Sequence, residues 1–130
     1  MRRRILVVDD DDATRQAAAL CLHTMAGWDV VEAYCGAQAI ESATQHQPDA
    51  ILLDVMMPAM DGPAMLAKLR ASRATSHIPI VLLTAKVEAV RNGSLSHLPV
   101  AAILLKPFDP LRLAGQLADA LGWEGDIVAH

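Results

Sequence analysis

Apolar residues along this chain fall into short continuous runs, and each run is followed by a longer stretch with helical spacing. The runs are rich in Val, Ile and Leu without polar alternation, which is typical of strands that are buried on both faces. This pattern predicts strands over residues 4–8, 28–34, 49–55, 78–85 and 100–105.

The stretches between the runs predict helices over residues 12–27, 36–47, 63–72, 86–98 and 109–122. In the first, Asp11 or Asp12 is a candidate N-cap and Gly27 stands where a helix commonly ends. An apolar stripe at helical spacing runs along this helix, formed by Ala13, Ala17, Leu20, Cys21 and Met25. The fourth helix is the weakest, because its Asn-Gly-Ser segment is unfavourable in a helix interior.

Proline and aspartate residues mark other helix boundaries. Pro48 follows the second helix, and Pro63 occupies the first turn of the third. For the last helix we expect Asp109 as the N-cap and Pro110 at the first position. Five strands alternating with five helices predict an α/β fold, an open parallel sheet with helices on both faces. Such sheets bind ligands beyond the carboxyl ends of their strands.

Length and composition restrict the class of protein. The chain has 130 residues, which suggests one domain, expected over residues 1–122 with residues 123–130 as a tail or the start of a linker. Hydrophobic residues make up 53% and charged residues 20%, which excludes a disordered chain. The net charge of −4 argues against nucleic-acid binding by this domain. The three arginines at positions 2–4 are too few for a basic tract.

Cysteine use and hydropathy bear on the compartment. Cys21 and Cys35 lack the spacing of metal or redox motifs, so we expect two buried thiols in a reducing compartment. No apolar stretch reaches the roughly 18 residues of a membrane helix. The apolar run near the N-terminus is too short for a signal peptide. These features predict a cytoplasmic, soluble domain without membrane contact.

Polar residues stand at the carboxyl ends of four of the five runs. Asp9 and Asp10 follow the first run, Asp54 ends the third, Thr84 ends the fourth and Lys106 follows the fifth. In a parallel sheet these positions meet at one edge. Carboxylates are preferred ligands of Mg²⁺, and a lysine ammonium suits a phosphate oxygen. The pattern therefore predicts a site for Mg²⁺ and a phosphoryl group.

The candidate nucleophile is Asp54. No glycine-rich nucleotide loop is present, so the expected phosphoryl group is one attached to the protein itself. A cation shared by Asp10 and Asp54 would offset charge during transfer, with Lys106 acting from the other side. Asp11 and Asp12 are assigned to the helix start, where the helix dipole favours acids.

Four stretches match a known pattern in residue type, order and separation: ILVVDDD, AILLDVMMPAMDG, IPIVLLTAK and ILLKPFDP. Through them the chain resembles the receiver domain of two-component response regulators over residues 4–121. The resemblance implies a flavodoxin-like fold with strand order 2-1-3-4-5. It also implies a signalling protein, not an enzyme with outside substrates, that catalyses only its own aspartyl phosphorylation and dephosphorylation.

The resemblance implies a role for each acid of the site. Asp54 corresponds to the phosphoacceptor and also to a ligand of Mg²⁺. Asp10 corresponds to the direct ligand of the metal, and Asp9 to a ligand that acts through water. The backbone carbonyl of Met56 would be the remaining protein ligand.

The resemblance also implies roles for the later strands. Thr84 corresponds to the switch hydroxyl that moves toward the phosphoryl group, and Lys106 to the phosphate-binding lysine. The bond between Lys106 and Pro107 would be cis, and Gly62 fits the turn after the acceptor loop. The implied partners are a sensor histidine kinase or a histidine phosphotransfer protein. A homodimer could form through residues 87–98, the fifth strand and residues 109–121.

The chain departs from the family pattern near the fifth strand. The usual aromatic switch residue, three positions before the lysine, is replaced by Ile103, and the common Gly-Ala-Asp-Asp approach by residues 99–102. Coupling of Thr84 to the outer face must therefore use aliphatic side chains, or it is weak. Gly93 points to a loose fourth helix, which we expect to be mobile.

Two alternatives come from other functional classes. A magnesium-dependent phosphohydrolase usually carries a second acid two residues after its nucleophile, but Met56 occupies that position. A degenerate receiver could serve only as a protein-binding module. The five retained polar residues of the site argue against this alternative, while Ile103 leaves some room for it.

Overall fold

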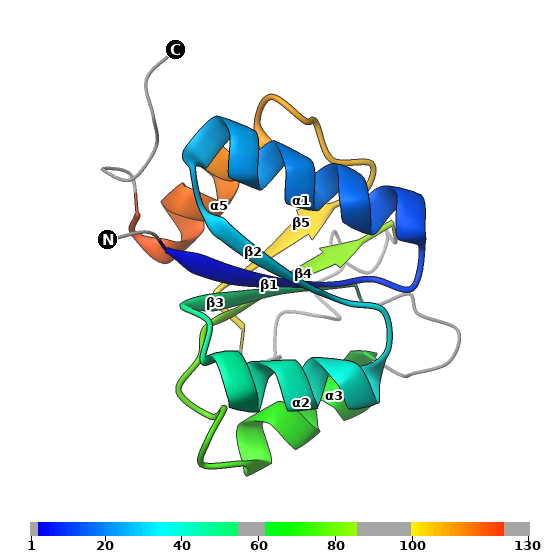
Figure 1. Ribbon diagram of the computed structural model, residues 1–130, viewed down its shortest axis with the longest axis vertical. Helices are drawn as coiled ribbons and strands as arrows, with labels where there is room; N and C mark the ends of the chain where they lie inside the picture. Colours follow the sequence, from blue (N-terminus) through cyan, green and yellow to red (C-terminus); the bar gives the residue numbers. More distant parts are fainter. Residues whose placement is uncertain (1–2, 55–61, 86–99, 124–130) are drawn as a thin grey trace.

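A parallel β-sheet forms the middle layer of the structure, a computed structural model that describes residues 3–54, 62–85 and 100–123 (Figure 1). Its five strands lie in the order β2-β1-β3-β4-β5, as expected for a flavodoxin-like sheet. The strands are β1 (Arg4–Val8), β2 (Asp29–Ala33), β3 (Ala50–Asp54), β4 (Ile80–Thr84) and β5 (Ala102–Leu105). All five predicted strands are confirmed, most of them shortened at their ends.

Helices cover both faces of this sheet. Helices α1 (Asp12–Ala26) and α5 (Leu113–Leu121) lie on one face, and α2 (Gly36–His46) and α3 (Gly62–Ala71) lie on the other (Figure 1). The fourth predicted helix, residues 86–98, lies outside the described residues, so its existence and its expected mobility stay predictions.

The core consists of two clusters, one on each face, because successive residues of a strand point to opposite sides. Ile5 and Leu52 pack toward α1 and α5, whereas Leu6 and Leu53 pack toward α2 and α3. Every residue of β3 and β4 is buried. Continuous apolar runs are thus required by a sheet that has no solvent-facing side.

The buried face of α1 is not the stripe indicated by the sequence. Ala13, Ala17 and Leu20 are exposed, and the buried positions are Arg15, Ala18, Ala19, Leu22 and Ala26. The helix carries two apolar stripes, and spacing does not tell which one faces the sheet. The buried stripe is the one that contains Arg15, and the outward stripe, with Ala13, Ala17 and Leu20, lies at the surface.

The last helix begins later than predicted. Residues 110–112 form a turn, and α5 starts at Leu113 with Arg112 as its N-cap. Asp109 caps this turn instead, because its Oδ1 accepts a hydrogen bond from the backbone N–H of Leu111 at 2.9 Å. Its carbonyl oxygen accepts from Leu113 at 3.0 Å. The predicted capping residue therefore acts one turn before the helix.

Aromatic residues join the two ends of the described chain. The guanidinium of Arg3 lies 4.8 Å from the ring centroid of Trp123. Trp123 in turn meets Trp28 edge to face, with ring centroids 5.2 Å apart. Both indoles are buried in the cluster under α1 and α5, so the core includes Trp123.

Cys21 and Cys35 are free thiols, half-buried rather than buried as expected. Burial raises the pKa of the Cys21 thiol. In the parts of the chain that the structure describes, none of the helices combines the length and the apolar character needed to cross a bilayer.

The assignment of faces on α1 predicts unequal effects for two leucines of the same helix. Leu22 is fully buried, so Leu22→Ala should lower the free energy of unfolding by about 2–5 kcal/mol. Leu20 is 66% exposed, so Leu20→Ala should change it by no more than about 0.5 kcal/mol. Urea denaturation of both variants tests this, and equal losses would contradict the assignment.

Candidate functional site

The site lies where the parallel strands end. Val8 of β1 pairs with Leu53 of β3, so the residues that follow them, Asp9 and Asp54, come out side by side. On the next strands, Thr84 pairs with Leu105, and Lys106 follows directly. The sheet register thus brings the five predicted residue positions to one edge.

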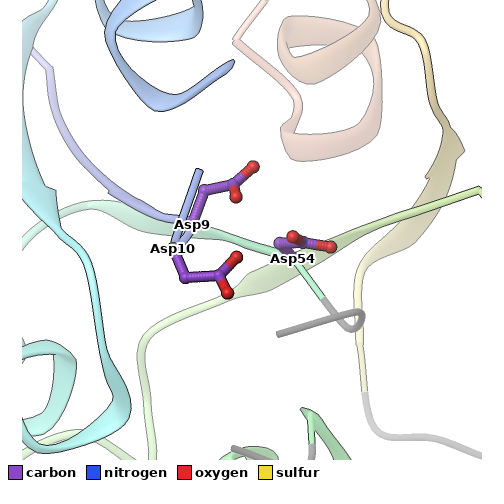
Figure 2. Close-up of side chains that lie close together, drawn as sticks. All are labelled: Asp9, Asp10 and Asp54. Carbon is purple, nitrogen blue, oxygen red and sulfur yellow. The ribbon is translucent and has the colours of Figure 1, made fainter. Parts of the chain in front are cut away.

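Three carboxylates gather at this edge (Figure 2). One oxygen from each of Asp9, Asp10 and Asp54 lies within 4.8 Å of the other two. Asp9 and Asp54 are each 3% exposed, whereas Asp10 is exposed at the mouth of the site. Buried carboxylates this close repel one another unless positive charge offsets them.

Lys106 supplies positive charge to the two buried acids. Its Nζ lies 2.9 Å from Oδ2 of Asp54 and 3.1 Å from Oδ2 of Asp9. Burial works to lower the pKa of Lys106, but the hydrogen bonds to the Asp54 and Asp9 carboxylates, together with their negative charges, outweigh it and raise the pKa. The lysine therefore stays protonated at neutral pH.

Asp9 belongs to the turn that joins β1 to α1 as well as to the acid cluster. Its Oδ1 accepts a hydrogen bond from the backbone N–H of Asp11 at 2.9 Å. Burial raises the pKa of Asp9, and the nearby charge of Asp54 adds to the rise, against the opposing hydrogen bonds from Asp11 and Lys106. A cation at the cluster would favour the ionised form.

The other two aspartates of the acidic run belong to α1, as predicted. Asp11 is the N-cap, and its Oδ2 accepts a hydrogen bond from the backbone N–H of Thr14 at 2.9 Å. The hydroxyl of Thr14 donates to the same carboxylate, and these bonds lower the pKa of Asp11. Asp12 lies in the first turn and pairs with Arg15.

The remaining residues that the sequence predicts for the site are Thr84, the Lys106–Pro107 bond, Gly62 and Met56. Thr84 is fully buried at the end of β4, and its carbonyl oxygen accepts from the backbone N–H of Lys106 at 2.7 Å. The bond between Lys106 and Pro107 is cis, as the resemblance implies. Gly62 is the first residue of α3. Met56 lies outside the described residues.

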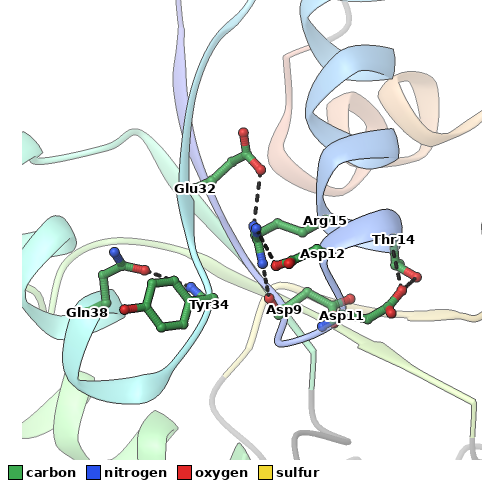
Figure 3. A network of polar contacts seen from close by, with 8 residues as sticks. All are labelled: Asp9, Asp11, Asp12, Thr14, Arg15, Glu32, Tyr34 and Gln38. Atoms are coloured by element: carbon green, nitrogen blue, oxygen red, sulfur yellow. Dashed lines mark hydrogen bonds and ion pairs between the residues drawn. The ribbon is translucent and has the colours of Figure 1, made fainter.

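Sequence reasoning missed Arg15, whose guanidinium points toward Asp9 of the acid cluster (Figure 3). It is 8% exposed, and its guanidinium contacts Asp12, Glu32 and the backbone carbonyl of Asp9. Arg15 lies three, four and seven residues before Ala18, Ala19 and Leu22, but the spacing does not tell that this stripe is the buried one. An arginine on a buried stripe indicates a paired charge.

The donor set suits a hard divalent cation. All three side chains of the cluster offer carboxylate oxygens, the ligands that Mg²⁺ prefers. Asp10 faces the solvent from which a hydrated ion would arrive. Lys106 offsets the charge of one carboxylate and leaves negative charge in excess for the cation.

A model of the response regulator receiver domain family matches residues 5–118. The chain belongs to this family. Among relatives of this receiver domain, RpaA of Synechocystis, a DNA-binding transcriptional regulator, is 38% identical over 112 residues, which are 82% of this chain and 44% of RpaA. The response regulator MtrA of Mycobacterium tuberculosis is 36% identical over 130 residues, 100% of this chain and 55% of MtrA. The chain spans about half the length of these curated relatives.

Solved receiver structures share the fold. Chemotaxis protein CheY4 of Vibrio cholerae superimposes with a TM-score of 0.82 at 28% identity, covering 92% of this chain and 99% of CheY4. The receiver domain of sensor kinase PA1611 of Pseudomonas aeruginosa gives 0.80 at 29% identity, covering 94% and 99%. In that PA1611 structure, a magnesium ion is coordinated in the active-site cleft.

The geometry of the cluster predicts that the Asp10 carboxylate strengthens cation binding but does not stabilise the metal-free fold. Asp10→Asn removes one of three crowded charges, so the metal-free variant should unfold at the same or a higher temperature than wild type. The stabilisation that added Mg²⁺ gives wild type should shrink strongly in the variant. Thermal unfolding with and without Mg²⁺ measures both effects.

Asp119→Asn is the matched control, because Asp119 is an exposed aspartate on α5, away from the site. It should retain the full response to Mg²⁺. A clear loss of metal-free stability in Asp10→Asn would contradict the crowding argument.

Proposed function

We propose that this receiver accepts a phosphoryl group on Asp54 with Mg²⁺ as cofactor, and that this modification switches its binding partners. The observation that carries the proposal is the environment of the Asp54 carboxylate. It is buried at the sheet edge, bonded to the ammonium of Lys106 and within 4.8 Å of two further carboxylates. This arrangement holds a nucleophile between a lysine and a cation site.

In the proposed phosphoryl transfer, Asp54 is the nucleophile and the neighbouring acids hold the metal ion. An oxygen of Asp54 forms the new bond to phosphorus while the bond from phosphorus to the histidine nitrogen of the donor breaks, and that nitrogen keeps the electron pair. Asp9 and Asp10, with Asp54 and the Met56 carbonyl, are proposed to hold Mg²⁺. Bound Mg²⁺ supplies positive charge that offsets the phosphoryl oxygens.

Lys106 and Thr84 act on the transferred group. Lys106 already contacts Asp54 and is placed to bind a phosphoryl oxygen once the carboxylate becomes an acyl phosphate. Thr84 stands at the neighbouring strand end, and we assign its hydroxyl as the donor to another phosphoryl oxygen. These assignments agree with the roles that the resemblance implies.

A groove beside the site fits a protein donor. Its volume is about 540 Å³, and it lies between α1 and the segment that follows β5. Lys106 is among the residues that line it, together with the apolar side chains of Ala13, Ala17, Phe108 and Pro110. Ala13 and Ala17 of the outward stripe of α1 thus share this groove with Lys106, which contacts Asp54. A sensor histidine kinase or a phosphotransfer protein would cover this groove while presenting its phosphohistidine.

Several other statements belong to the same proposal. We place the domain in the cytoplasm, where a sensor kinase acts. A homodimer through the segment 87–98, β5 and α5 stays a proposal, because that segment lies outside the described residues. The degenerate receiver has no support, since the acids and the lysine come together.

Phosphorylation with a small donor tests the proposal. With Mg²⁺ and acetyl phosphate, the intact mass should rise by about 80 Da, the size of one phosphoryl group. The adduct should be stable in acid and labile in base, and it should be absent in Asp54→Asn or with a chelator. The Asp119→Asn variant should form it normally.

The absence of an adduct with acetyl phosphate and with kinases would favour a binding module. Steady release of phosphate from many unrelated monoesters would favour a phosphohydrolase instead. Either result would overturn the proposed function.

The groove predicts a variant that separates small donors from protein donors. Ala17 is exposed and lines the groove, so Ala17→Arg should obstruct a docked protein without touching Asp54. Phosphorylation by a histidine kinase that modifies wild type should fall at least tenfold, whereas phosphorylation by acetyl phosphate should stay unchanged. An arginine placed elsewhere on α1, in Gln16→Arg, is the control. Equal loss with both donors would contradict the docking argument.

A further inference from the structure

Arg15 is a buried cation that the proposed chemistry does not use. An arginine with 8% exposure is retained in a core only when its guanidinium is fully paired. Here the partners come from the acidic run of residues 9–12 and from β2 (Figure 3). Nη2 lies 2.7 Å from Asp12 at the start of α1, and Nε lies 3.1 Å from Glu32 on β2.

The third partner of Arg15 belongs to the metal site. Nη1 donates a hydrogen bond to the backbone carbonyl of Asp9 at 3.0 Å, a contact that is buried. This carbonyl is part of the peptide unit that joins Asp9 to Asp10. Because the peptide unit is planar, holding its oxygen fixes the plane from which Asp10 departs.

The contact matters because the turn carries the exposed ligand of the cluster. Asp54 is fixed within β3, but Asp10 lies beyond the last paired residue of β1. The bonds that hold the turn between β1 and α1 include Asp9 N–H to the Ala33 carbonyl, Asp11 N–H to Oδ1 of Asp9, and Arg15 to the Asp9 carbonyl. The last two of these involve a charged group, and only the bond from Arg15 comes from a side chain outside the turn.

Charge near a cation site must also be balanced. A lone guanidinium behind the cluster would oppose the approach of a divalent ion. Asp12 and Glu32 surround Arg15 with two negative charges, so the arginine can support the turn without repelling the metal. Burial tends to lower the pKa of Arg15, but its bonds to Asp12 and Glu32 raise it, so the group stays charged.

We propose that Arg15 is a positioning residue for the cation site, which orients the Asp9–Asp10 peptide and thereby the Asp10 carboxylate, with Asp12 and Glu32 as its supports. The inference rests on the proposed function, because it assumes that the acid cluster binds a divalent cation. Partners that orient the ligands of a metal commonly change its affinity by about 10- to 100-fold when removed.

Binding of Mn²⁺ to the metal-free protein is the direct test, because Mn²⁺ takes the same oxygen ligands and is visible by electron paramagnetic resonance. Arg15→Met should raise the Kd for Mn²⁺ by at least about tenfold. Arg15→Lys keeps the charge but lacks the fork that reaches three partners, so it should restore only part of the affinity. Arg112→Met is the matched control, since the side chain of Arg112 is 79% exposed and pairs with Asp109, outside the acid cluster.

Kinetics separate positioning from a general structural role. In Arg15→Met, the Mg²⁺ concentration that half-saturates phosphorylation by acetyl phosphate should rise with the Kd. The rate at saturating Mg²⁺ should stay within about twofold of wild type. All measurements are made well below the unfolding midpoint of each variant.

Glu32→Gln provides a second variant in case Arg15→Met does not fold. It leaves the arginine in place but removes the charge of one support, and it should raise the Kd in the same direction by a smaller factor. Unchanged Mn²⁺ affinity in the folded variants, even with lowered stability, would overturn the positioning role and leave the proposed function intact. Failure of wild type itself to bind Mn²⁺ and to form the adduct would overturn both.

Discussion

The ammonium of Lys106 lies between the carboxylates of Asp9 and Asp54, and the organisation of the site depends on this contact. Both acids are almost fully buried, so water does little to screen their repulsion. Removal of one partner from such a group leaves an uncompensated buried charge, which is strongly destabilising. Lys106 therefore ties the end of β5 to the ends of β1 and β3. With Asp10 included, the cluster still holds excess negative charge, which a divalent cation can offset.

The central strands show why the polar residues of the site stand where the strands end. Because β3 and β4 are buried throughout between the helices of the two faces, a charge has no position along them before their ends, whereas the edge strand β2 carries the exposed Glu32. Parallel pairing then brings the first polar residue of each strand to a common edge. Asp9, Asp54 and Lys106 are far apart in the chain, yet the register places them within hydrogen-bond distance. The fold and the charge cluster are thus two results of one pattern.

This pattern also determines what could be predicted from sequence. Strands and the acid cluster were predictable because continuous apolar runs and their end residues can be identified without knowledge of packing. The buried face of α1 was not, because the helix has two apolar stripes and the sheet covers the one that contains Arg15. The start of α5 was misplaced because Asp109 caps a turn, and local sequence does not separate a turn from a first helical turn. Arg15 was missed because its partners on β2 and in the acidic turn meet it only in the folded chain.

Ile103, which replaces the usual aromatic residue, lies on the edge strand β5 and packs against the cluster under α2 and α3. Strand register aligns Val8, Leu53, Leu82 and Ile103 in one row, and all four belong to or pack against the cluster under α2 and α3. This row lies one residue before Asp9 and Asp54, directly beneath the acid cluster. Because protein interiors are close-packed, the side chains of this row fill neighbouring positions on one face of the sheet. An aliphatic row thus runs from the strand ends beneath the acid cluster to Ile103 of β5.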